Sequence, residues 1–297
     1  AMEQIRLGLA NKAALVVPNH ITRQFGKAIF VLYPQAKALI TTKEDFEKKN
    51  RQKFLSRVAL SDVQLVVIGH SQFEKIMMPV AYQEQKLREE LEEIMFGLDQ
   101  ARKERGQHWT VKQMESQKKS LETQLKKLLE SSRKDTMITF DQMGINSLFV
   151  DEAHYYKNLA TFSKMTNVAG VSNAKAQKAS DMCMKCDYLS EYNGIVTFAT
   201  GTPISNSIAE MYVMQRYLQQ DLLLSKGIRC FDEWASVFGE TTTERELTPE
   251  GNGYRFRTRF AKFHNVPVLM QMFCEVADIQ TADMLQLPVP QLAEGKA

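Results

Sequence analysis

Short runs of consecutive apolar residues recur along this chain, and they restrict its fold more than any other feature. The runs occupy residues 13–17, 36–41, 63–69, 147–150 and 194–200. Apolar residues that follow one another without alternation are typical of strands buried on both faces, as in a parallel sheet. Helical patterns lie between the runs, at residues 20–32, 44–58, 173–192 and 206–220. The alternation predicts an α/β fold in which helices cover both faces of a parallel sheet.

Residues 83–133 interrupt this alternation with a different pattern. Apolar residues recur there every three or four positions, which predicts two helices with one apolar stripe each. The stripes are Leu87, Leu91, Ile94 and Leu98, then Met114, Leu121, Leu125 and Leu128. Residues 103–109, "KERGQHW", can turn the chain between them. We expect an inserted antiparallel helical hairpin whose two apolar stripes pack together. The alternative is that the hairpin binds a partner or nucleic acid.

These patterns divide the chain into four parts. The parts are a first portion of the α/β unit at 1–82, the helical hairpin at 83–135, a second portion of the α/β unit at 136–225, and a helical or irregular extension with a linker at 226–297. Within the extension, Phe231, Trp234 and Phe238 fall on one face of a predicted short helix, which favours core packing. Pro288 and Pro290 are typical of a linker.

Composition restricts the setting of the chain. Hydrophobic residues are 44% of the 297 residues and charged residues 25%, as in ordinary soluble globular proteins. A net charge of +3 neither requires nor excludes nucleic acid. No membrane span or signal peptide is apparent, and the few cysteines favour a reducing, cytoplasmic location. Cys183 and Cys186 have a metal-like spacing without further ligands nearby, so we interpret them as core thiols.

Polar residues follow each of the apolar runs. They are Pro18, Asn19 and His20; Thr41 and Thr42; His70 and Ser71; Asp151 and Glu152; and Thr200, Gly201 and Thr202. Because parallel sheets bind ligands at the carboxyl ends of their strands, these residues predict a site there. The adjacent acids Asp151 and Glu152 are a weak signal by themselves, since a solvated Asp-Glu turn is common.

A second candidate site lies between residues 247 and 265. Four basic residues, Arg255, Arg257, Arg259 and Lys262, are interleaved there with Tyr254, Phe256, Phe260 and Phe263. Basic residues among aromatic ones can bind phosphates and bases. A strand or helix with one buried face produces the same pattern, and the two interpretations stand equal.

Four stretches occur in a fixed order: "VVPNH" (16–20), "VVIGHSQFEK" (66–75), "FVDEAHYYKN" (149–158) and "FATGTPISNS" (198–207). Over about residues 10–245 the chain resembles the first motor lobe of superfamily 2 helicases, and within them the Snf2-like group. In that group an Asp-Glu-Ala-His box precedes a lysine-asparagine pair, and a later motif reads threonine-glycine-threonine-proline. More narrowly, the stretches look like the helicase region of large helicase–methylase proteins of bacterial conjugative elements and phages.

The resemblance implies a RecA-like lobe of an ATP-dependent DNA translocase, with ATP and Mg²⁺ as cofactors. Asp151 would hold the magnesium ion, and Glu152 would orient and deprotonate the attacking water. His154 would link the nucleotide site to Thr200, Gly201 and Thr202, which would carry the nucleotide state to DNA. The DNA backbone would be bound, without reading of sequence, by Pro18, Asn19, His20, His70 and Ser71. For His20 and His70, a merely structural role stays open.

Two parts of that machinery are missing from the sequence. No Gly-rich loop ending in Lys-Ser/Thr occurs in the 297 residues, and a second motor lobe is absent. We therefore expect a piece of a longer protein that lacks the phosphate-loop strand and does not hydrolyse ATP by itself. Its partners would be DNA, the second lobe and, by resemblance, a methylase domain. The alternative is a non-catalytic remnant that binds DNA or protein.

Overall fold

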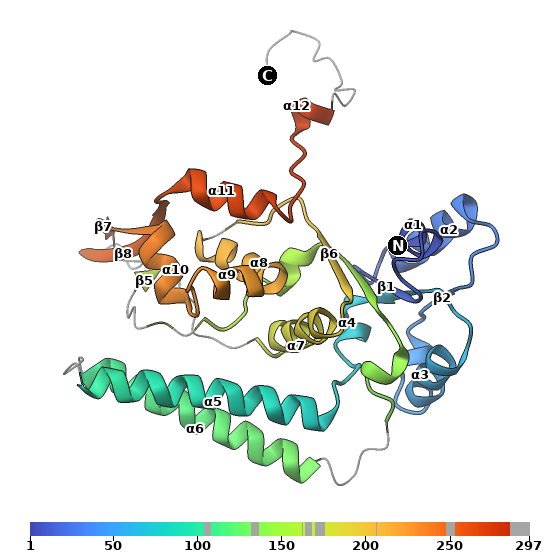
Figure 1. Ribbon diagram of the computed structural model, residues 1–297, viewed down its shortest axis with the longest axis horizontal. Coiled ribbons are helices and arrows are strands. Elements are labelled where there is room, and N and C mark those ends of the chain that lie inside the picture. The colour runs from blue at the N-terminus through green and yellow to red at the C-terminus, as the bar shows by residue number, and fades with distance from the viewer. Residues whose placement is uncertain are drawn as a thin grey trace.

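The structure is a computed structural model that describes residues 1–103, 108–131, 137–161, 163, 168–169, 176–205, 207–247 and 253–285 (Figure 1). Five strands form its central sheet: β1 (Ala13–Val17), β2 (Ala38–Ile40), β3 (Leu65–Gly69), β4 (Ser147–Asp151) and β6 (Ile195–Ala199). Their order is β2-β3-β1-β4-β6, and every neighbouring pair is parallel. The predicted α/β fold is therefore confirmed, and it is consistent with a RecA-like sheet.

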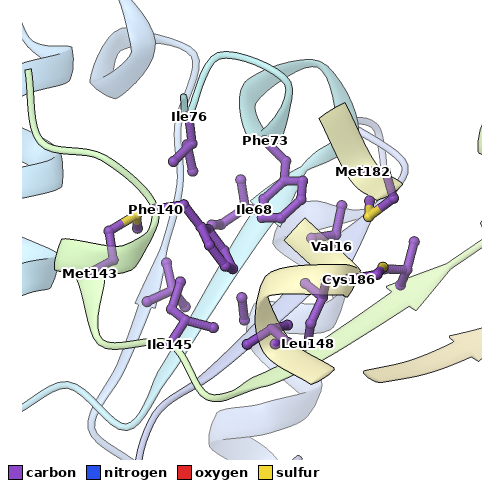
Figure 2. Packing of buried hydrophobic residues seen from close by; sticks show 14 of the residues in the cluster. Val16, Ile68, Phe73, Ile76, Phe140, Met143, Ile145, Leu148, Met182 and Cys186 are labelled. Atoms are coloured by element: carbon purple, nitrogen blue, oxygen red, sulfur yellow. The ribbon is translucent and has the colours of Figure 1, made fainter. Parts of the chain in front are cut away.

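The inner strands β1 and β3 are buried on both faces, because side chains alternate along each strand and helices cover both sides of the sheet. The covering helices are α1 (Met2–Arg6) and α2 (Thr22–Leu32) on one face, and α3 (Arg51–Leu60) and α7 (Gln177–Glu191) on the other. On the α7 side, Val16 and Ile68 pack in one cluster with Met182 (Figure 2). On the α2 side, Val17 packs with Ile29.

The two neighbouring cysteines of α7 belong to the core. Cys183 and Cys186 are free thiols and are buried. Burial raises the pKa of the Cys183 thiol to about 12, which keeps it protonated at neutral pH. The prediction of core thiols is confirmed.

The helix expected at 44–58 is divided in two. A 3-10 turn, η1 (Glu44–Phe46), precedes α3. The Asp45 carboxylate accepts hydrogen bonds from the Thr42 backbone N–H and hydroxyl, both at 2.8 Å. This local turn competes with a continuous helix, because Asp side chains offer the backbone an alternative partner.

The predicted helical hairpin is present as α5 (Val80–Lys103) and α6 (His108–Ser131), which lie side by side (Figure 1). Ile94, Leu98 and Leu121 are buried between the helices, so the two apolar stripes pack together as expected. At its base α5 is joined to α7, where Lys86 pairs with Glu191 at 2.8 Å. No helix in the described ranges is both long and apolar enough to cross a membrane.

A second core lies beyond the sheet. It is enclosed by α8 (Ala209–Leu218), α9 (Gln220–Ser225), α10 (Phe231–Phe238), α11 (Val266–Cys274) and the strand β8 (Tyr254–Phe263). Phe231, Trp234 and Phe238 of α10 are buried in it, which confirms their predicted packing role. The Trp234 Nε1–H donates to the buried Gln215 Oε1 at 2.8 Å, so the indole buries no unsatisfied donor.

The strand β8 is the middle of a small second sheet. It pairs antiparallel with β7 (Gly239–Leu247) and parallel with the short β5 (Val168–Ala169). The remaining elements are α4 (His70–Phe73), η2 (Asp141–Met143), η3 (Ala153–Tyr156) and α12 (Ala282–Leu285). The predicted linker prolines, Pro288 and Pro290, lie outside the described residues.

Candidate functional site

The polar residues that follow the strands lie along one edge of the sheet, because the carboxyl ends of parallel strands point the same way. Across the sheet, the order of these residues is Thr41 and Thr42 after β2, His70 and Ser71 after β3, Pro18, Asn19 and His20 after β1, Asp151 and Glu152 at β4, and Thr200, Gly201 and Thr202 after β6. Ligands of open α/β sheets bind at this edge. The edge is therefore the candidate site.

The paired acids mark a sharp turn of the backbone. Asp151 is the last residue of β4, and Glu152 adopts the left-handed conformation with φ 51° and ψ 48°. For a residue with a side chain this conformation costs on the order of 1–2 kcal/mol, so the surrounding fold must hold it. The turn leaves the Glu152 side chain 49% exposed at the sheet edge, while Asp151 is half-buried.

A chain of polar contacts runs from Glu152 to the loop after β6. The Nδ1 atom of His154 lies 3.2 Å from Glu152 Oε2 and 3.0 Å from Thr200 Oγ1. The Thr200 hydroxyl oxygen also accepts the backbone N–H of Thr202 at 3.1 Å. With its proton on Nδ1, His154 donates toward the carboxylate and the hydroxyl together. One imidazole thus connects two neighbouring strand ends.

Glu210, on α8, is a functional candidate that sequence reasoning missed. Its carboxylate pairs with Lys157 at 3.1 Å, and only 10% of its side chain is exposed. It also accepts the Ser205 backbone N–H at 2.6 Å and the Ser205 hydroxyl at 3.2 Å, and Lys157 donates to the same hydroxyl. Through these contacts Glu210 connects Ser205, in the loop after β6, with Lys157, which follows η3. The sequence feature that could have identified Glu210 is its position as an acid within the apolar stretch "IAEMYVM".

The loops after β1 and β3 are joined by Asn19. Its Oδ1 accepts the Ser71 backbone N–H at 3.3 Å and the Ser71 hydroxyl at 3.2 Å. A Cβ atom at Gly69 would meet that oxygen at 2.3 Å, so glycine permits the close approach. Asn19, His20 and Ser71 are exposed, and they form the accessible part of this side of the edge.

His70 does not belong to that accessible part, which corrects the expectation that it meets a phosphate. Only 4% of the residue is exposed, and its Nδ1 lies 3.0 Å from the Tyr156 hydroxyl. The Tyr155 ring covers it at a centroid distance of 4.8 Å. Burial lowers the pKa of His70 to about 4, a change that Asp151 opposes only in part. The neutral ring is therefore an interior residue that joins α4 to η3.

The basic and aromatic tract forms β8. The ladder places Arg255 opposite Glu246, Arg257 opposite Glu244 and Arg259 opposite Thr242. The side chains of Arg255 and Arg257 lie outside the described residues, and that of Arg259 is exposed. The backbone register thus sets a glutamate opposite each of the first two arginines.

Asp151 and Glu152 place two carboxylates at this edge of the sheet. No group of three or more His, Cys, Asp or Glu side chains in the described ranges could hold a metal ion. Magnesium is commonly bound by one or two carboxylates while phosphates and waters complete its octahedron. Asp151, at the end of β4, offers such a carboxylate.

A cavity of about 180 Å³ lies away from this edge. Its walls include Asp187 of α7, Tyr217 of α8 and Glu275, which follows α11. It contains none of the residues that follow the strands of the sheet, so it does not extend the candidate site.

Fold and site together define an α/β protein whose polar loops gather at the carboxyl edge of a parallel sheet. The chain belongs to the family described as a probable helicase domain, whose model matches residues 1–281. Over 162 residues, 52% of the chain, it is 26% identical to the "Defense against restriction protein B" of Escherichia phage P1. That match spans 7% of the phage protein's length.

Proposed function

We propose that this chain is part of the first motor lobe of an ATP-dependent DNA translocase or helicase of the Snf2-like group. Membership of the helicase family supports the general role. The observation that carries the finer proposal is the contact path from Glu152 through His154 to Thr200 and Thr202. Such a path joins an acid that can activate water to a loop that can respond to the nucleotide.

In this proposal the two acids have separate tasks. Asp151 is a ligand of magnesium, which neutralises charge on the terminal phosphates when bound. Glu152 orients the attacking water and accepts its proton, and its exposed carboxylate can reach solvent. The left-handed backbone at Glu152 turns the chain sharply at the end of β4. His154 holds Glu152 in position through the 3.2 Å contact.

The loops after β1 and β3 are the proposed contact with the DNA backbone. Asn19, His20 and Ser71 are exposed there, and Pro18 is half-buried beside them. Hydroxyl, amide and backbone N–H groups commonly bind phosphates and fix position without reading sequence. Asn19 orients Ser71 through two hydrogen bonds, so these two residues act together.

The rest of the motor is proposed to belong to a longer polypeptide. The phage relative is far longer than its match with this chain, which supports that arrangement. A Gly-rich phosphate loop supplies most of the binding of a triphosphate through backbone N–H groups and a lysine. We propose that this loop, a second lobe and, by resemblance, a methylase domain lie elsewhere in that polypeptide.

The test is DNA-stimulated ATP hydrolysis by the longest natural reading frame that contains these residues. Glu152→Gln should lower turnover by about two to four powers of ten and leave nucleotide binding intact. Glu92→Gln, on the exposed side of α5, is the matched control and should behave as wild type. Turnover of Glu152→Gln within threefold of wild type, or a frame without a phosphate loop, would favour a non-catalytic module that binds DNA or protein.

A further inference from the structure

The far end of the β7–β8 hairpin carries exposed aromatic side chains that the proposed motor does not use. Tyr254 is 62% exposed, Phe256 78% and Leu247 56%. Arg245 lies beside them, with its guanidinium carbon 4.6 Å from the centroid of the Tyr254 ring. We name Arg245, Leu247, Tyr254 and Phe256 the aromatic face.

The second core does not require these exposed rings. Alternate residues of a strand share a face, so Tyr254 and Phe256 point to the same side of β8 as Phe260. Phe260 is buried, with its ring centroid 5.6 Å from that of Phe231. The helices of the second core thus cover one end of this side, and the aromatic face is exposed at the other. Exposed apolar groups gathered in this way are typical of a binding site.

We propose that the aromatic face binds single-stranded DNA by stacking bases on Tyr254 and Phe256. This inference rests on the proposed function for the identity of the ligand. Aromatic side chains stack on any base, and such stacking needs no particular sequence. Two residues of an antiparallel strand span about 6.8 Å, roughly twice the 3.4 Å rise per nucleotide within a duplex. The two rings therefore suit neighbouring bases of a stretched single strand and not those of a stacked duplex.

Charge on the aromatic face favours nucleic acid over an apolar protein segment. The ladder places Arg245 opposite Phe256, while Arg255 and Arg257 are opposite glutamates. A cation beside a stacked base is well placed to meet the phosphate that follows it. The aromatic face is thus a proposed DNA contact of this hairpin. The sequence suggested Arg255, Arg257 and Arg259 as DNA contacts, and the aromatic face is proposed in addition to them.

The test measures binding of a short single-stranded oligonucleotide containing 2-aminopurine to the 297-residue chain. Stacking should quench the 2-aminopurine fluorescence on binding. Tyr254→Ala with Phe256→Ala should weaken binding by about thirtyfold or more and abolish the quenching, given the usual contribution of stacking on two aromatic rings. Phe96→Ala with Tyr192→Ala is the matched control, since both rings are exposed elsewhere at 63% and 67%. The control should bind and quench as wild type.

A second variant tests whether binding requires the aromatic rings, as DNA bases would, or only an apolar surface, as a protein segment would. Tyr254→Leu with Phe256→Leu keeps an apolar surface but removes the rings, so it should fail in the same way as the alanine variant. Because the replaced side chains are exposed, melting temperatures should match wild type, and binding is compared only between variants that meet this condition. Wild-type affinity and quenching in the alanine or the leucine variant of Tyr254 and Phe256 would overturn the proposal.

Failure of the aromatic-face proposal can be distinguished from failure of the proposed function. If single-strand quenching is absent while the longer reading frame still shows DNA-stimulated hydrolysis that Glu152→Gln abolishes, only the aromatic face is refuted. If the chain quenches 2-aminopurine through Tyr254 and Phe256 but that frame shows no DNA-stimulated hydrolysis, the motor is refuted and the stacking site stands.

Discussion

The His154 imidazole lies 3.0 Å from the Thr200 hydroxyl, and this contact between residues 46 positions apart joins the ends of two neighbouring strands. Thr200→Val keeps the shape of the side chain but removes the hydroxyl. DNA-stimulated ATP hydrolysis in the longer polypeptide should fall about threefold to tenfold, the value of one ordinary hydrogen bond. Hydrolysis without DNA should change less, because Glu152 keeps its contact with His154. Thr241→Val, on the exposed part of β7, is the control, and an equal loss in both assays would contradict a coupling role.

The Lys157–Glu210 ion pair should stabilise the chain more than a surface pair does. Their side chains are 17% and 10% exposed, whereas those of Lys37 and Asp62 are 58% and 83% exposed. A double-mutant cycle with Lys157→Met and Glu210→Gln should give a coupling energy of about 1–3 kcal/mol in urea unfolding. The cycle with Lys37→Met and Asp62→Asn should give a clearly smaller coupling energy, because solvent screens exposed charges. Equal couplings would show that solvent screens both pairs alike.

His70 should make the chain less stable in mild acid. Its pKa is lowered to about 4 in the fold, against 6.5 for an ordinary histidine, so the unfolded chain binds more protons between these values. The free energy of unfolding should therefore have its full value above about pH 6.5. It should fall by on the order of 3 kcal/mol as the pH decreases toward 4. His70→Asn should reduce this slope in urea unfolding at pH 5 and pH 7. Tyr156→Phe, which keeps the imidazole, should retain the slope, and an unchanged slope in His70→Asn would exclude His70 as its source.

Gly69→Ala should disturb the loop that follows β1. The backbone at Gly69, φ −72° and ψ 148°, accepts alanine, but the new Cβ would lie 2.3 Å from Asn19 Oδ1. Asn19 is exposed and can move, so the cost is the loss of its two hydrogen bonds to Ser71, about 1 kcal/mol. Thermal unfolding should detect this cost in the wild-type background and not in Asn19→Ala. A similar cost in both backgrounds would trace the effect to another neighbour.

Local pattern was enough to predict the sheet. The run at 13–17 coincides with β1, and that at 147–150 falls one residue short of β4. The hairpin helix α5 begins at Val80, three residues before the expected start at 83, since the Pro79 carbonyl accepts the first helical hydrogen bond from Gln83 at 3.0 Å. Continuous apolar runs and apolar stripes are signals that each segment carries within itself.

The environment of individual polar residues could not be predicted in this way. His70 is buried because Tyr155 and Tyr156 cover it, and these rings come from a segment about 80 residues further along the chain. Glu210 becomes a partner of Lys157 only when α8 packs beside the sheet. Arg255 and Arg257 of β8 are opposite glutamates because of a strand register that depends on the pairing with β7. In each case the environment of the residue depends on tertiary contacts, which the local sequence does not contain.

The hairpin of α5 and α6 has a mechanical consequence. Each helix has 24 residues and is therefore about 36 Å long. The arm is held at its base, where Lys86 meets Glu191 at the end of α7. A rotation of about five degrees at that point displaces the far end by roughly 2–3 Å, as a lever does. A pair of fluorescent labels, one on the sheet and one near residue 102, would turn small rearrangements at the base into a measurable change of distance.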